Sequence, residues 1–185
     1  MVARMVKETK DLTSIIYDNI SSIFNPNNIY MKGKDGVSNI VLFDEPVLID
    51  GEKSRYRILY SSMMVFEDDK LRLAIEILPN KPTPPRDIAG PIPVYMVTRK
   101  VVINRRNGKK TEYELTDKNS KFNLLIVIPD QFEGSQKSQK SLQIKDLNEK
   151  FKGVIDLESE YSNLKDFAIC EISDLDSVLE RLLKN

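Results

Sequence analysis

The chain has 185 residues, 41% of them hydrophobic and 30% charged, and its 28 basic side chains are balanced by 28 acidic ones. This length and composition predict a single domain, residues 1–185, that buries a hydrophobic core. Because the net charge is 0, an affinity for nucleic acid has to come from a local cluster of basic side chains.

Two residue types are scarce, since the sequence contains no histidine and only one cysteine. Without histidine, Ser-His-Asp and Cys-His catalysis and histidine-bearing zinc sites are excluded. Cys170 lies in the apolar run FAICEI, which favours a buried structural thiol over a nucleophile. An enzyme of this composition works with carboxylates, lysines and hydroxyl groups, and Mg²⁺, or Mn²⁺ in its place, is the cofactor that such oxygen ligands suit.

The first half of the chain predicts one helix followed by strands. No apolar run is long enough for a signal peptide or a membrane span, so we expect a soluble cytoplasmic protein with no membrane partner. Residues 5–24 have helical spacing, and residues 36–50 predict a strand, or a strand pair broken at Pro46. Residues 56–67 and 71–78 predict a hairpin, which we expect at the centre of a sheet because nearly every position is apolar.

Residues 81–120 predict an insertion composed of a stiff proline-rich connector and a hairpin. The connector extends to Pro93, with room for a short helical turn, and prolines exclude a continuous helix. The hairpin covers residues 94–116 and turns at Asn107-Gly108, the strongest turn signal in the sequence.

The last third of the chain predicts alternating strands and helices. A fully buried strand at 122–128 precedes a polar, mobile loop at 131–145. A helix that breaks near Gly153, a strand at 166–173 and a closing helix follow. The closing strand-helix-strand order favours parallel pairing and the opening meander favours antiparallel pairing. The sequence therefore predicts an α/β protein, of α+β type, with a central mixed β-sheet and flanking helices.

This order of elements resembles a known nuclease fold. A helix, a meander whose third strand carries a glutamate in AIEI, the buried run LLIVI, a helix and the segment FAICEISDLDSVLERLL are similar to the PD-(D/E)XK nuclease-like core. The resemblance covers roughly residues 5–80 and 121–184. It implies magnesium-dependent hydrolysis of DNA by two carboxylates and a lysine, and it implies a homodimer, since nucleases of this kind often pair to cut two strands.

Glu76 matches the glutamate of that family, and it is the anchor of the predicted site. The chain departs from the family pattern in having Leu78 where the lysine is expected, and Ser61 and Ser62 where the aspartate is expected. Either other residues replace these groups or the fold has lost its chemistry. A buried carboxylate in a strand needs a partner, so the alternative role for Glu76 is a structural ion pair.

Other residues can replace the missing groups. Asp44 and Glu45 lie on the strand before the hairpin, from which they can reach the end of the sheet beside Glu76, and the three are the candidate metal ligands. Lys81 follows the third strand closely and is the candidate catalytic lysine, while Asp87 lies on the connector. The competing interpretation is that these are ordinary solvated side chains near strand ends.

A run without acidic residues predicts a nucleic-acid-binding surface. Its basic members are Arg99, Lys100, Arg105, Arg106, Lys109 and Lys110. A two-stranded ribbon with a basic tip suits a nucleic-acid groove, and sparse aromatic residues favour duplex DNA over a single strand or RNA. The alternative is that these charges only keep an edge strand soluble.

Three hypotheses follow from these patterns. The chain is a magnesium-dependent nuclease anchored on Glu76, a catalytically inactive nucleic-acid-binding protein on the same fold, or a structural protein that self-associates. A carboxylate cluster around Glu76 distinguishes the first from the second. A contiguous positive surface distinguishes both from the third.

Overall fold

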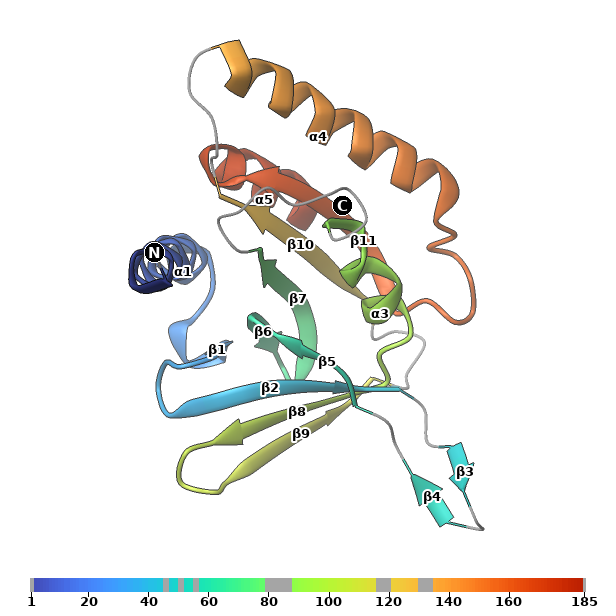
Figure 1. The fold of residues 1–185 in the computed structure, drawn as a ribbon. Helices are drawn as coiled ribbons and strands as arrows, with labels where there is room; N and C mark the ends of the chain where they lie inside the picture. Colours follow the sequence, from blue (N-terminus) through green and yellow to red (C-terminus); the bar gives the residue numbers. More distant parts are fainter. Residues whose placement is uncertain are drawn as a thin grey trace.

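The computed structural model describes residues 2–44, 47–49, 52–54, 57–78, 88–115, 121–129 and 135–184, with side chains described from residue 12 of the first helix and residue 144 of the fourth. A mixed sheet, a second antiparallel sheet and flanking helices make up these residues (Figure 1), which confirms the predicted α/β class. No helix among the described residues is long and apolar enough to cross a membrane.

The central sheet has five strands in the order β1-β6-β7-β10-β11. These strands are β1 (Ile29–Met31), β6 (Met63–Glu67), β7 (Lys70–Ile77), β10 (Phe122–Ile128) and β11 (Leu164–Glu171). β1, β6 and β7 pair antiparallel, whereas β7, β10 and β11 pair parallel. The predicted closing parallel pair is therefore confirmed, and so is the antiparallel hairpin of β6 and β7. The first strand of the predicted meander, residues 36–50, is not in this sheet, and β1, which the sequence did not predict, takes its place beside β6.

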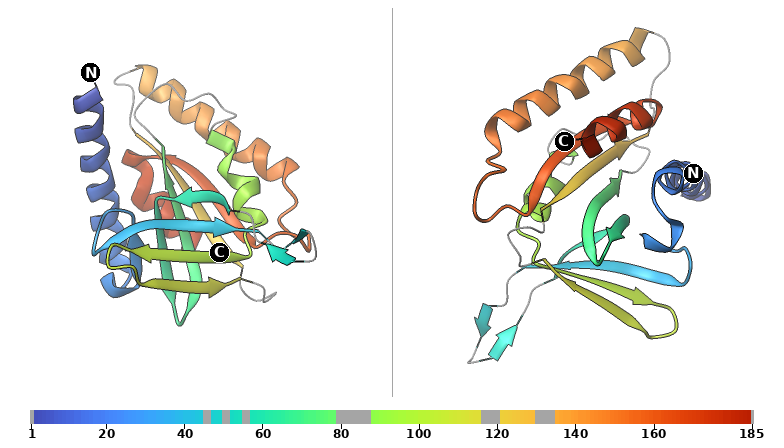
Figure 2. Two further views of the ribbon diagram at one scale, coloured as in Figure 1. Left: turned by 60° about the horizontal axis from the view of Figure 1, so that its bottom comes forward. Right: turned by 180° about the vertical axis from the view of Figure 1, so that it is seen from behind.

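Helices cover the central sheet on both faces (Figure 2). One face packs against α1 (Val2–Ile23) and α5 (Leu175–Lys184), which the short helical turns η1 (Pro26–Asn28) and η2 (Ile172–Asp174) connect to neighbouring strands. The opposite face packs against α3 (Pro91–Met96) and α4 (Ser135–Val154). Coverage on both faces explains why every residue of β10 is buried.

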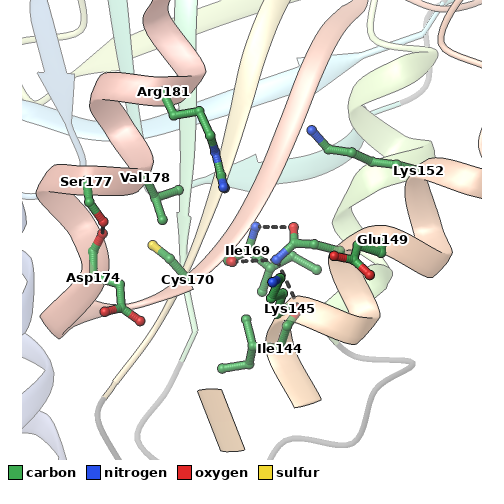
Figure 3. Close-up of a pocket in the computed structure, with 11 residues that line it drawn as sticks. Ile144, Lys145, Glu149, Lys152, Ile169, Cys170, Asp174, Ser177, Val178 and Arg181 are labelled. Atoms are coloured by element: carbon green, nitrogen blue, oxygen red, sulfur yellow. Dashed lines mark hydrogen bonds between the residues drawn. The ribbon is translucent and has the colours of Figure 1, made fainter. Parts of the chain in front are cut away.

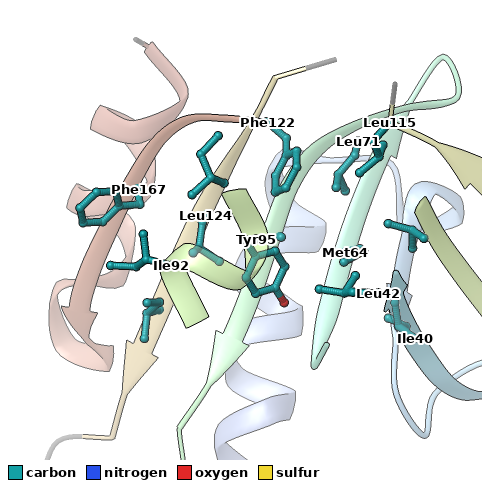
Figure 4. Close-up of a cluster of buried hydrophobic side chains, with 14 of the residues drawn as sticks. Ile40, Leu42, Met64, Leu71, Ile92, Tyr95, Leu115, Phe122, Leu124 and Phe167 are labelled. Carbon is teal, nitrogen blue, oxygen red and sulfur yellow. The ribbon is translucent and has the colours of Figure 1, made fainter. Parts of the chain in front are cut away.

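The second sheet has four antiparallel strands in the order β5-β2-β8-β9. They are β5 (Arg57–Ser61), β2 (Val37–Phe43), β8 (Lys100–Arg105) and β9 (Lys110–Glu114), while β3 (Val47–Ile49) and β4 (Glu52–Ser54) form a separate pair. Its inner face supplies residues such as Leu42 and Ile40 to the core that also holds Met64 and Tyr95 (Figure 4). The outer face carries most of its polar side chains.

Three segments differ from their predicted structure. The strand expected at 56–67 divides at Ser62, because β5 pairs in the second sheet and only β6 is central. The hairpin expected from residue 94 begins at Lys100, because Pro91 starts a helix whose last residue is Met96. The helix α4 begins at Ser135, inside the segment 131–145 that we expected to be a loop.

Candidate functional site

Glu76 lies near the end of β7, and its side chain is 8% exposed. It faces α3, where the Tyr95 hydroxyl donates a hydrogen bond to Glu76 Oε1. On the other side the Ser62 hydroxyl donates to Glu76 Oε2 over 3.0 Å. The buried carboxyl group therefore joins the helix α3, the strand β7 and the bend between the two sheets.

The hydroxyl groups around Glu76 form a continuous network. The Tyr95 hydroxyl lies 2.8 Å from Ser61 Oγ, and Ser61 Oγ donates to the Met63 carbonyl over 3.4 Å. The backbone N–H of Ile77 donates to Ser62 Oγ over 3.3 Å. Ser61 and Ser62 lie where the chain leaves the second sheet and enters the central one, so this sheet crossing places two hydroxyl groups beside one carboxyl group.

Burial raises the pKa of Glu76 to about 7 from its ordinary value of 4.5, although the hydrogen bonds from Tyr95 and Ser62 oppose the rise. Burial and the nearby Glu76 carboxyl group also raise the pKa of the Tyr95 hydroxyl well above its ordinary value. Both protonation states of Glu76 fit the network. The ionised carboxylate accepts from Tyr95, whereas a protonated carboxyl group donates to Tyr95, which then donates to Ser61.

The predicted metal ligands are not gathered around Glu76 in the described part of the chain. Asp44 follows β2 and is half-buried, while Glu45, Lys81 and Asp87 lie outside the described residues. Within the described ranges, no group of three or more carboxylate or thiol side chains is placed to hold a metal ion. The contacts of Glu76 there are hydroxyl groups, rather than the second carboxylate or the cation that we expected.

Arg99, predicted to bind nucleic acid, holds the protein together instead. It is 7% exposed, and its guanidinium donates to the Met96 carbonyl over 3.3 Å and to the Tyr161 carbonyl over 2.9 Å. A guanidinium buried on backbone carbonyls cannot reach a phosphate at the surface. We therefore leave Arg99 out of the candidate nucleic-acid surface.

Lys100 faces acidic residues across the hairpin. Its ammonium group contacts Glu112, which raises the pKa of Lys100, and it lies 3.5 Å from Glu114 Oε1. Residues 99–110 contain no acidic side chain, but the acidic residues Glu112 and Glu114 follow closely. The hairpin register places these two residues beside Lys100. Lys100 is neutralised locally and adds little positive charge to the surface.

The other four basic residues surround the hairpin turn. The Gly108 N–H donates to the Arg105 carbonyl over 3.0 Å, and Gly108 has a φ of +79°, which glycine adopts without strain. The guanidinium of Arg105 lies 5.7 Å from the Tyr30 ring centre and donates to the Asp35 carbonyl over 3.3 Å. Arg106, Lys109 and Lys110 are exposed, as a phosphate-binding surface requires.

A second turn, residues 32–36, lies against this hairpin turn (Figure 1). The Arg106 N–H donates to the Gly36 carbonyl over 2.8 Å, which brings Lys32 and Lys34 to the same end of the molecule. The Lys34 ammonium lies 2.9 Å from the centre of the Tyr17 ring. Sequence reasoning missed these two lysines, although the run KGKDG signals a turn that follows a strand.

The turn at 32–36 also contacts the surroundings of Glu76, since the Lys32 N–H donates to the Ser62 carbonyl over 3.1 Å. Ser62 is the residue whose hydroxyl donates to Glu76. The basic turns and the buried carboxyl group are thus connected through one short segment of backbone.

No family model, curated protein or solved structure matches this chain.

Proposed function

We propose that this chain binds nucleic acid, and duplex DNA in preference to RNA, through a surface that we name the basic tip. The basic tip consists of Lys32, Lys34, Arg105, Arg106, Lys109 and Lys110. The observation that carries the proposal is the hydrogen bond from Arg106 to Gly36, which holds two turns far apart in the sequence side by side. It gathers six basic side chains at one end of a protein whose net charge is 0.

The basic tip is suited to contact phosphates because its backbone is held in place. The Arg105 N–H donates to the Lys109 carbonyl over 2.9 Å, and the Lys109 N–H donates to Asn107 Oδ1 over 3.1 Å. Asp35 lies among the basic residues, and its carbonyl accepts a hydrogen bond from Arg105. Arg106, Lys109 and Lys110 remain exposed for phosphates, whose contacts fix position without reading sequence.

The test replaces Arg106, Lys109 and Lys110 by serine together. A control variant replaces three exposed lysines outside the tip, Lys150, Lys165 and Lys184, and removes the same charge. We expect the tip variant to bind a short DNA duplex more weakly and with a smaller salt dependence, by up to about 0.9 in the log-log slope for each lost phosphate contact. Equal affinities and slopes for the two variants would reject the basic tip as the contact surface.

A second candidate function is metal-dependent hydrolysis of a phosphodiester, with Glu76 as the anchor. The observation that favours it is a buried carboxyl group with a pKa near 7, on the strand where the sheet changes from antiparallel to parallel pairing. The described residues alone do not fit a divalent cation, since they offer one carboxylate whose two oxygens accept hydrogen bonds from hydroxyl groups. The proposal therefore depends on Glu45 or Lys81.

Magnesium binding tests this second function directly. If Glu76 holds the metal, added magnesium should raise the melting temperature of the wild-type protein and leave Glu76→Gln unchanged. Glu114→Gln is the control, because it removes an exposed carboxylate from another strand. A metal effect that is equal in all three proteins, or absent from all, would leave nucleic-acid binding without hydrolysis as the better account.

A further inference from the structure

A cavity of about 370 Å³ lies beside β11, between α4 and α5 (Figure 3). β11 is the edge strand of the central sheet, and α4 and α5 cover opposite faces of that sheet. The cavity therefore opens along the free edge of the strand, with one helix on each side. It lies near the carboxyl end of β11, which is where open α/β sheets bind their ligands.

At Ile169, on the floor of this cavity, the backbone N–H and carbonyl are already hydrogen-bonded and are not available to a ligand. The Ile169 N–H donates to Asn148 Oδ1 over 2.8 Å, and Asn148 Nδ2 donates back to the Ile169 carbonyl over 2.8 Å. The side-chain amide of Asn148 thus pairs with the strand edge as a neighbouring strand would. Ile144, Ile169 and Val178 supply an apolar patch beside this pair, within a lining that is otherwise mostly polar.

The walls of the cavity supply positive charge. Figure 3 shows Arg181 from α5 and Lys152 from α4 pointing toward the space above Ile169. Lys152 Nζ lies 2.6 Å from Asp166 Oδ1, so its charge is partly compensated. Arg181 forms no ion pair with any residue in the described ranges, which leaves its five N–H donors available to a ligand.

Acidic residues line the cavity as well, but they do not face Arg181. Glu149 lies on α4 and Asp174 precedes α5. Figure 3 shows the Glu149 carboxylate beyond Ile169 and the Asp174 carboxylate below Cys170, both directed away from the guanidinium of Arg181. The lining is therefore mixed, and it combines a guanidinium that forms no ion pair among the described residues with the apolar patch of Ile144, Ile169 and Val178.

We propose that this cavity binds a small organic anion. Its carboxylate or phosphate group is held by Arg181, and its apolar body lies against Ile144, Ile169 and Val178. The volume falls within the range of small-molecule sites, and the polar share of the lining suits a charged ligand. This site is separate from the basic tip, which consists of turns of other strands.

The test is titration calorimetry of the full chain with phenyl phosphate, benzoate and inorganic phosphate. Phenyl phosphate and benzoate both carry an apolar ring, so their comparison identifies the preferred anionic group. We expect one of them to bind at least about tenfold more tightly than inorganic phosphate, because only they use the apolar surface. Inorganic phosphate binding as tightly as both ring compounds would overturn the proposal, as would no binding by any probe.

Two variants of α5 locate the binding. Arg181→Gln removes the proposed anion contact, and we expect it to weaken the tighter probe about tenfold or more. Lys184→Gln is the matched control, because Lys184 lies one turn further along and pairs with Glu180 over 2.6 Å. Equal loss in both variants would overturn the assignment to Arg181. DNA binding by Arg181→Gln should equal that of wild type, so failure of this site and failure of the basic tip are distinguishable.

Discussion

Charged side chains have different environments in the two sheets. In the central sheet both faces are covered, and Glu76 is a carboxyl group surrounded by hydroxyl groups and apolar residues. In the second sheet the outer face carries charged side chains at the surface around the buried pair Val41 and Val102, and Lys100 there contacts Glu112 across the hairpin. Burial raises the pKa of Glu76 to about 7, whereas the exposed charges of β8 and β9 compensate one another at the surface.

This difference indicates that burial, rather than the presence of a charged neighbour, is the main cause of the raised pKa of Glu76. An exposed ion pair changes stability little, because water already solvates both partners. A carboxyl group removed from water loses that solvation, and the neutral hydroxyl donors around Glu76 replace it in part. The central sheet therefore holds the candidate proton-binding group, and the second sheet presents the candidate binding surface.

The largest expected effect is on the free energy of unfolding, and it compares how tightly side chains pack in the two sheets. Leu124 on β10 is fully buried, so Leu124→Ala should lower the free energy of unfolding by roughly 2 to 5 kcal/mol. Val102 lies on the outer face of β8, where it is 7% exposed and lines a surface pocket, and Val102→Ala should cost about 1 to 2 kcal/mol. Urea unfolding measures both. Equal losses would mean that the second sheet is packed as tightly as the central one.

The next effect sharpens the comparison through pH. Folded Glu76 keeps its proton up to about pH 7, whereas the unfolded chain releases it near its ordinary pKa of 4.5. Stability is therefore full below the lower pKa and is lost as pH rises to the higher one, by roughly 3 kcal/mol in all. Glu76→Gln carries no titrating group, so its stability relative to wild type should rise by that amount between about pH 4 and about pH 8.

Urea unfolding at several pH values checks this expectation. The control is Glu160→Gln, an exposed carboxylate whose removal should change stability by less than about 0.5 kcal/mol at every pH. A difference between Glu76→Gln and wild type that is constant with pH would show that Glu76 is ionised throughout the range. That result would favour an undescribed cation, such as Lys81, as its partner.

The sequence was sufficient to predict much of the central sheet. Apolar runs with fixed ends predicted β7, β10 and β11, and the position of Glu76 within β7 followed from the alternation of side chains. The crossing between sheets at Ser62 could not be predicted, because the run from residue 56 to residue 67 is apolar on both sides of it. Strand partners depend on long-range packing, which a local pattern does not contain.

Of the residues in the candidate site around Glu76, the sequence predicted only Glu76 itself. Tyr95 was expected on a hairpin strand, and the signal that was missed is Pro91, since proline is favoured in the first turn of a helix. The neutralisation of Lys100 could not be predicted, because a two-residue turn at Asn107-Gly108 would place Leu115 opposite Lys100, whereas the observed register is shifted by one residue and places Glu114 there. The contact between residues 32–36 and Arg106 joins segments about 70 positions apart, and no local pattern predicts it.

The smallest expected effect tests the network around Glu76 with the carboxyl group still in place. Tyr95→Phe removes the hydroxyl that bonds Glu76 and Ser61, and it should cost about 1 to 2 kcal/mol. The hydrogen bond from Tyr95 lowers the pKa of Glu76, so its loss raises that pKa further. The cost should therefore be larger at about pH 8, where wild-type Glu76 is ionised, than at about pH 5.

Tyr113→Phe is the matched control for this measurement, because it removes one half-buried hydroxyl that lies 3.1 Å from the Tyr30 hydroxyl at the periphery of the same core cluster. Its cost should be about 1 kcal/mol or less and the same at both pH values, because burial raises the pKa of Tyr113 above its ordinary value of 10.0. A Tyr95→Phe cost that does not change with pH would show that the Tyr95 hydroxyl bonds both forms of Glu76 equally and does not lower its pKa. The pKa of Glu76 would then be set by burial and by Ser62, and Tyr95 would have only a structural role.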